Sequence, residues 1–224
     1  MTDAHFHRNQ YETYLVRDGR EVRFFGIHPW EAADAPADRL VAVRDAVARD
    51  PSAGVGEIGL DRLRTKSVPD AQRAAFAAQL AIAAEFGRPA VLHGAKCWGE
   101  VVKACVPYRG RIPAFLFHGF SRSGGLLPDI VALNGFVSVG PALCNDHAVN
   151  YRRLVKEIPL DRLLVETDAD VSASPAPDAP APDAPAAPGA RDVLLKLAEL
   201  RGLAADALEA AVDANAARFT ESLA

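Results

Sequence analysis

Short apolar segments alternate with longer amphipathic ones along most of the chain. The apolar segments are about five residues long and lack polar–apolar alternation, as expected of parallel strands buried on both faces. We expect such strands at residues 3–6, 23–27, 54–58, 89–93, 114–118, 136–139 and 162–166. Helices are expected at residues 38–49, 69–86, 121–133, 146–158 and 191–201. This alternation predicts an α/β fold with a parallel sheet.

The length of the chain favours one closed or nearly closed barrel. With 224 residues it is long for a small domain and short for two, so we expect residues 1–224 to form a single domain. Strand–helix alternation over this length is typical of a TIM-like barrel.

Residues 11–25 interrupt this alternation. Tyr14-Leu15-Val16 and residues 21–25 are apolar segments on either side of Asp18-Gly19, a pair that favours a tight hairpin turn. No helix fits between His7 and Arg23, so one βα unit is missing. We therefore predict an irregular or seven-stranded barrel in which a hairpin replaces that unit.

Residues 172–189 interrupt it a second time, with 6 Pro and 7 Ala. This composition favours extended polyproline II structure over helix or sheet. We interpret the segment as a surface loop within the domain and without a function of its own. A lid over the substrate is the alternative, because the segment follows a strand end.

Polar side chains gather at the expected strand ends. Two histidines lie two apart in the first strand, and alternation places both on one face. The others follow or end four later strands, and all strand ends of a parallel barrel meet at one mouth. The complete set is His5, His7, Glu57, His93, His118 and Asp168.

This set has the chemistry of a divalent-metal site. Imidazole and carboxylate ligands suit Zn, Mn or similar ions. Six ligands exceed what one open catalytic site needs, so we expect two ions bridged by Glu57, an arrangement that hydrolyses phosphoesters. A single histidine at a strand end is usually structural, but four of the six histidines together with two carboxylates favour metal.

Three further residues are candidates for substrate binding. Asp61 follows Glu57 by four positions and could contact a ligand, although a loop aspartate is usually a turn residue. His28, in GIHPW, would contact a phosphate or pack against Trp30. Lys96 would neutralise a phosphate, with a solvated lysine as the favoured alternative.

Composition narrows the function classes. The net charge of −4 argues against a broad basic face for duplex DNA, so nucleic acid would need a local or metal-mediated grip. The three cysteines show no CxxC spacing and no base partner, which favours free thiols in a reducing cytoplasm. No apolar run is long enough to span a membrane, and the N-terminus lacks signal-peptide features.

Taken together, the motifs resemble the TatD family of metal-dependent deoxyribonucleases, within the amidohydrolase-like TIM-barrel hydrolases. The motifs DAHFH, GIHPW, GEIGLD, VLHGAK, FHGFSRSG, LLVETDAD and NAARF follow in that family's order, from Asp3 to about Phe219. The resemblance implies that His5, His7 and Glu57 bind one ion.

The resemblance assigns roles to the remaining residues. It implies that Glu57, His93 and His118 bind a second ion, that Asp168 binds metal and activates the attacking water, and that His28 lies near the substrate phosphate. Members of the family usually have an arginine in the loop after the histidine of VLH, and Lys96 is the residue closest to that position in this sequence. Ala169-Asp170 replaces Ala-Pro, so the substrate entrance differs.

We therefore predict a cytoplasmic hydrolase that uses two divalent ions (Zn, Mn or Mg) to activate a water against phosphodiester bonds. Catalysis would depend on Asp168 and Glu57, and DNA is the substrate that the resemblance implies. The same site acting on a small phosphoester, ester or amide is one alternative. A non-catalytic, metal-bound scaffold is another, and no stable protein partner is implied.

Overall fold

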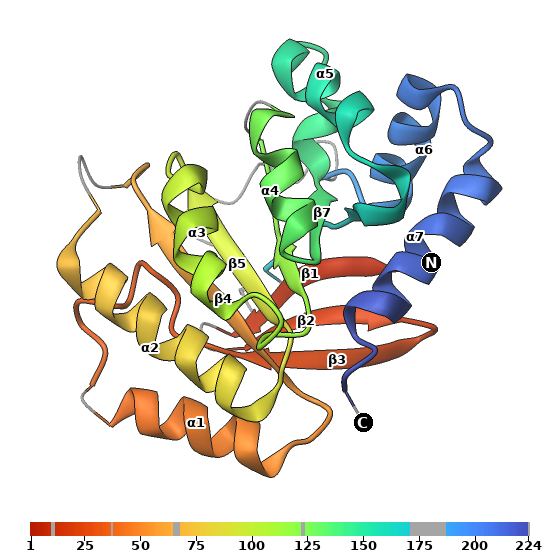
Figure 1. Ribbon diagram of the computed structural model, residues 1–224. Helices are drawn as coiled ribbons and strands as arrows, with labels where there is room; N and C mark the ends of the chain where they lie inside the picture. The colour runs from red at the N-terminus through yellow and green to blue at the C-terminus, as the bar shows by residue number, and fades with distance from the viewer. Residues whose placement is uncertain (10–11, 37, 65–67, 122–123, 171–186, 224) are drawn as a thin grey trace, which may run out of the picture.

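The structure is a computed structural model that describes residues 1–9, 12–36, 38–64, 68–121, 124–170 and 187–223 (Figure 1). Eight strands form one sheet in the order of the chain. They are β1 (Asp3–Asn9), β2 (Glu12–Arg17), β3 (Arg20–Phe25), β4 (Gly54–Asp61), β5 (Ala90–Ala95), β6 (Phe115–Phe117), β7 (Gly135–Val139) and β8 (Leu163–Val165).

Strand β2 makes this barrel irregular. It pairs antiparallel with both β1 and β3, whereas every pair from β3 to β8 is parallel. Asp18 and Gly19 form the two-residue turn between β2 and β3, with φ of 52° and 72°. Two positive φ values match the hairpin turn that Asp-Gly favours. The predicted irregular TIM-like barrel, with a hairpin in place of one βα unit, is confirmed; the seven-stranded alternative is wrong, since the sheet has eight strands.

Helices lie around the outside of the sheet (Figure 1). Each expected helix has a counterpart, although α4 is shorter than the sequence predicts. Two helices, α3 and α7, were not among those expected. The helices are α1 (Arg39–Arg49), α2 (Asp70–Phe86), α3 (Trp98–Cys105), α4 (Leu127–Ala132), α5 (Val149–Glu157), α6 (Ala190–Arg201) and α7 (Ala205–Phe219). Short 3₁₀ turns occupy Val106–Tyr108, Gly124–Leu126, Pro141–Cys144 and Leu160–Arg162. Within the described ranges, no helix has the length and hydrophobicity needed to cross a membrane.

The α2 helix carries two buried glutamines that hold loops near the strand ends. Gln79 Oε1 accepts a hydrogen bond from the Ile27 amide at 2.6 Å, and its Nε2 donates to the Ile27 carbonyl at 3.2 Å. Seven residues earlier in the same helix, Gln72 Oε1 accepts from the Asp61 amide at 2.9 Å. Seven residues span two helical turns, so both amides face the barrel. The helix therefore fixes the backbone beside two candidate site residues.

The barrel closes where β1 meets the chain that follows β8. The Asp168 amide donates to the His5 carbonyl at 3.0 Å, and the His7 amide donates to the Ala169 carbonyl at 2.8 Å. Asp3 reinforces this junction, because its carboxylate accepts from the Thr167 amide at 2.9 Å and hydroxyl at 2.7 Å. Barrel closure therefore brings the two histidines of β1 beside Asp168.

Helix α7 seals the opposite end of the barrel. The Phe219 ring lies 5.8 Å from the Phe24 ring of β3 and 5.9 Å from the Phe136 ring of β7, centre to centre. Asn215 is buried, and its Nδ2 donates to the carbonyls of Leu160 and Leu163 at 2.8 and 2.7 Å. These contacts attach the C-terminal helix to the start of β8.

Replacing Asn215 with alanine tests this attachment. Both carbonyls would lose their donor inside the protein, and a buried unsatisfied polar group costs about 1–3 kcal/mol. We expect Asn215→Ala to lower the free energy of unfolding by about 2 kcal/mol in urea titration. Exposed Glu221→Ala is the control, and equal stability of the two variants would contradict the role of Asn215.

Candidate active site

Two histidines of β1 point into the barrel mouth from the same face of the strand. His5 is fully buried and the His7 side chain is 24% exposed, and their rings meet edge to face at 4.9 Å. Their two-residue spacing places both on one side, as the sequence predicted. His7 lies nearer the opening, so β1 supplies one deep and one accessible imidazole.

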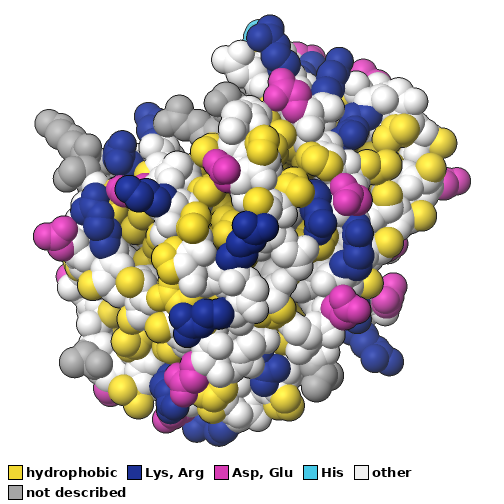
Figure 2. Space-filling model, viewed as in Figure 1, with side chains coloured by type: hydrophobic (Ala, Val, Ile, Leu, Met, Phe, Trp, Pro, Cys, Tyr) yellow, Lys and Arg dark blue, Asp and Glu magenta, His cyan; other side chains and the backbone are white. Residues whose placement is uncertain are grey.

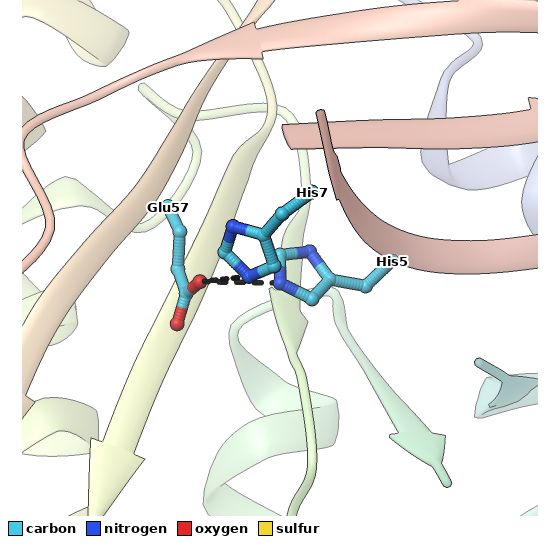
Figure 3. Close-up of side chains that lie close together, drawn as sticks. All are labelled: His5, His7 and Glu57. Carbon is cyan, nitrogen blue, oxygen red and sulfur yellow. Dashed lines mark hydrogen bonds and ion pairs between the residues drawn. The ribbon is translucent and has the colours of Figure 1, made fainter. Parts of the chain in front are cut away.

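The carboxylate of Glu57 lies at the centre of the site. All eight residues of β4 are buried, and Glu57 itself is only 3% exposed. Its Oε2 lies 3.1 Å from Nε2 of His5 and 3.3 Å from Nε2 of His7. Figure 3 shows both imidazoles reaching from β1 toward this one carboxylate.

The other oxygen of Glu57 meets three further imidazoles. Oε1 lies 2.6 Å from His93 Nδ1 and 2.6 Å from His118 Nε2. His28, expected at the substrate, has its Nε2 3.3 Å from the same oxygen. One carboxylate therefore joins ring nitrogens supplied by β1, by the ends of β5 and β6, and by the loop after β3.

This environment sets the charge of Glu57. Burial alone would raise the pKa of Glu57, but the imidazoles of His118 and His5 outweigh burial and hold that pKa well below its usual value. In the same cluster burial lowers the pKa of His28, so its imidazole favours the neutral form. The site thus offers an anionic carboxylate and a neutral imidazole, whose Nδ1 accepts from the Trp30 amide at 3.2 Å.

Asp168 stands at the accessible side of the cluster. Its Oδ1 lies 3.7 Å from His5 Nε2 and 3.6 Å from His7 Nε2, and half of its side chain is exposed. Burial favours a raised pKa of Asp168, but the hydrogen bond with His7 and the charges of His118 and His5 outweigh it and lower that pKa. Asp168 therefore presents a carboxylate toward the opening.

These residues border a cavity of about 930 Å³. His7, Glu57, His93, His118 and Asp168 line it, which places five of the six predicted metal ligands along its wall. The sixth, His5, lies directly behind His7. A cavity of this size accommodates a nucleotide or a substrate of similar dimensions.

Two carboxylates support the histidines from behind. Asp61, considered for substrate binding, does not line the cavity; its Oδ2 lies 3.0 Å from His93 Nε2, so it contacts a candidate metal ligand instead. Glu166, which sequence reasoning did not assign, is buried; its Oε1 accepts from the Gly119 amide at 2.8 Å and lies 3.7 Å from His118 Nδ1. Carboxylates in such positions orient metal-binding histidines.

Some predicted positions lie away from this cavity. Lys96 borders a separate hollow beside Arg62, so the structure does not bring it to the candidate ligands. Arg64 is the one lysine or arginine along the main cavity within the described part of the chain. Arg64 was not among the predicted site residues, although it follows the candidate residue Asp61 by only three positions. The predicted loop at 172–189 lies mostly outside the described residues.

The donor set fits divalent cations. Three trios have ligand atoms within 4.8 Å of one another: His5, His7 and Glu57; His5, His118 and Asp168; and His28, Glu57 and His93. Ring nitrogens crowd both oxygens of one carboxylate, and only protonated nitrogens are attracted to it. A cation between them would replace those protons. Mixed imidazole and carboxylate ligands suit zinc and manganese.

Comparison with known proteins agrees with this geometry. The family model described as TatD related DNase matches residues 2–221. The chain belongs to the TatD family. Among its relatives, the 3'-5' ssDNA/RNA exonuclease TatD of Pectobacterium carotovorum is 33% identical over 201 residues, covering 86% of this chain and 75% of the relative. The protein of the same name from Dickeya dadantii is 32% identical over 199 residues, covering 87% and 74%.

Solved structures support the same fold. YJJV, a TatD homolog from Escherichia coli K12, superimposes with a TM-score of 0.72 at 26% identity, covering 88% of this chain and 75% of that one. A TatD family hydrolase from Entamoeba histolytica gives 0.69 at 15% identity, covering 88% and 73%. The predicted family is confirmed, and this member of the TatD family is a metal-dependent hydrolase.

The pKa of His7 gives a prediction for metal binding to this TatD protein. Burial favours neutral His7, but hydrogen bonds to Asp168 and Glu57 outweigh it and raise its pKa to about 9. A metal needs the unprotonated nitrogen. Metal affinity should therefore rise with pH up to about 9 and level off above it.

Calorimetry in two buffers of different ionisation enthalpy measures the protons released. We expect proton release on Mn²⁺ or Zn²⁺ binding at pH 7.5, less at pH 10, and less at pH 7.5 in His7→Ala. His147→Ala, which changes an exposed histidine, should match the parent protein. An affinity that does not change between pH 7 and 9 would exclude His7 as a ligand.

Proposed function

We propose that this TatD protein hydrolyses phosphodiester bonds in single-stranded nucleic acid, from the 3′ end and with two divalent ions. The observation that carries the proposal is the position of Glu57, whose two oxygens face separate groups of histidines. Asp168 lies beside the group that contains His5. The relatives' names as 3'-5' ssDNA/RNA exonucleases support this substrate and direction.

The two groups of ligands share Glu57. His5 and His7 would hold one ion with Oε2, and His93 would hold the other with Oε1, joined by His118 or His28. Bound divalent ions supply Lewis acidity toward a phosphate and promote ionisation of water. Residues 1–224 would form one hydrolase domain around this pair.

The remaining chemistry falls to side chains of the chain. Asp168 is anionic, half exposed and close to β1, so it would accept the proton of the attacking water. Asp61 would keep the His93 ring oriented through its 3.0 Å contact. His28 lines the cavity and would lie beside a substrate phosphate, the position that the family resemblance implies.

The charge distribution favours a local grip on the substrate. The chain carries −4 overall, and basic and acidic side chains are interspersed over the face drawn in Figure 2. Binding of long duplexes depends on many phosphate contacts along a basic face. A short, flexible single strand entering the cavity needs few such contacts.

Asp168→Asn tests the proposed chemistry. Removing a general base lowers rates by about 100-fold to 10,000-fold, so we expect a loss of kcat in this range with a short single-stranded DNA. Mononucleotide release should require Mg²⁺, Mn²⁺ or Zn²⁺. Asp129→Asn makes the same change at an exposed position of α4 and should keep full activity.

Absence of DNA cleavage while metal is bound would contradict the nuclease proposal. Parallel assays with small phosphoesters, esters and amides would then identify the bond that this site attacks. Retention of full activity by Asp168→Asn would exclude Asp168 as the proton acceptor.

Glu57→Gln tests the shared ligand. A neutral amide cannot bridge two cations as a carboxylate does, so we expect two bound ions per chain in the parent protein and fewer in the variant. Metal analysis after gel filtration measures the ratio, and Asp129→Asn again serves as control. An unchanged ratio of two in Glu57→Gln would contradict a shared carboxylate.

A further inference from the structure

Trp30 and Arg64 form a stacked pair at the mouth of the cavity. Both line it, and the guanidinium carbon of Arg64 lies 3.7 Å above the centre of the Trp30 ring. Trp30 is 47% exposed, whereas the other tryptophan, Trp98, is 3% exposed. The proposed hydrolysis uses neither Trp30 nor Arg64. An exposed indole beside a polar cavity needs another explanation.

One buried carboxylate fixes both members of the pair. Asp61 is 1% exposed, and its Oδ2 accepts from Trp30 Nε1 at 2.6 Å. Its Oδ1 accepts from the backbone amides of Leu63 and Arg64 at 2.6 and 3.0 Å. The indole therefore has a fixed orientation while part of its surface stays open to solvent.

The pair lies within one nucleotide's length of the candidate metal ligands. The Trp30 ring centre is 4.4 Å from that of His28 and 6.0 Å from that of His93. Asp61 links Trp30 to His93, since its Oδ2 contacts both side chains. A substrate whose phosphate reaches His93 would place an adjoining base near the indole.

Arg64 adds a permanent positive charge to the cavity wall. It is the one lysine or arginine on the cavity wall among described residues, and acidic groups there include Glu57, Asp168 and Asp170. No ion pair joins Arg64 to a carboxylate in the described part of the chain. A guanidinium in this position suits a phosphate oxygen.

We propose that Trp30 and Arg64 form a nucleotide-binding subsite: Trp30 stacks on a base next to the scissile bond, and Arg64 binds a backbone phosphate. The subsite rests on the proposed nuclease function and defines its substrate as a strand with unpaired bases. A base inside a duplex is already stacked on its neighbours. Aromatic stacking accepts any base, so the subsite selects single strands without selecting sequence.

Steady-state kinetics on two oligonucleotides tests the stacking. One is a single-stranded DNA, and the other has abasic residues at its two 3′-terminal positions. We expect Trp30→Ala to raise KM about tenfold on the first and to leave the second within about twofold of the parent protein. Trp30→Phe keeps a ring but loses the Nε1 hydrogen bond, and it should retain a KM close to that of the parent.

Arg64→Gln provides the complementary variant. Loss of a phosphate contact should raise KM on both oligonucleotides and weaken the dependence of KM on salt. Equal losses of kcat on both oligonucleotides in Trp30→Ala and Trp30→Phe would overturn the subsite, because they would assign Trp30 to positioning Asp61. An unchanged KM in Trp30→Ala would overturn it as well.

Fluorescence separates this inference from the nuclease proposal, since it requires no hydrolysis. Deoxyadenosine monophosphate should quench Trp30 saturably, whereas deoxyribose 5-phosphate should not. Trp30→Phe retains only buried Trp98 and should lose the quenching. Quenching without DNA cleavage would support the subsite and reject the nuclease. Cleavage without quenching would reject the subsite alone.

Discussion

The burial of one carboxylate among imidazoles dominates this structure. Glu57 lies in a strand whose every residue is buried, and an ionised group there is tolerated only when charged or polar partners surround it. Those partners come from β1, from the loop after β3 and from the ends of β5 and β6. The strands must therefore assemble in the correct order for Glu57 to stay anionic once it is buried. A cation at this point would satisfy the same requirement, so folding of the barrel mouth and metal binding share one electrostatic condition.

Closure of the barrel supplies the other half of the site. The antiparallel strand β2 occupies the place of a βα unit, and it leaves β1 in register to pair with the chain after β8. Asp168 lies in this pairing with φ of 51°, a conformation uncommon for a residue other than glycine. The backbone hydrogen bond to His5 holds it there. The irregular barrel therefore keeps the candidate ligands of β1 beside Asp168, although the described residues between β1 and β3 contain no helix.

Sequence patterns predicted the site better than its surroundings. Buried apolar strands and the polar residues that end them leave a local signal, so His93 and His118 could be placed at one mouth. Roles that depend on three-dimensional neighbours left no such signal. His28 was expected at the substrate and lines the cavity, but its contact with Glu57 was not foreseen, because it depends on the loop after β3 being held by Gln79 of α2. Lys96 was considered for phosphate because of its position after His93, but the chain turns it toward Arg62.

Asp61 links helix α2, the candidate metal site and Trp30. Its amide is held by Gln72 of α2, and its carboxylate contacts His93, Trp30 and the amide of Arg64. Burial opposes ionisation of Asp61, but hydrogen bonds from His93 and Trp30 outweigh burial and lower its pKa. The anion thus orients a candidate metal ligand on one side and an exposed indole on the other. Because the same carboxylate fixes both, the packing of α2 on the barrel would set the distance between the reacting phosphate and the stacking surface that we propose.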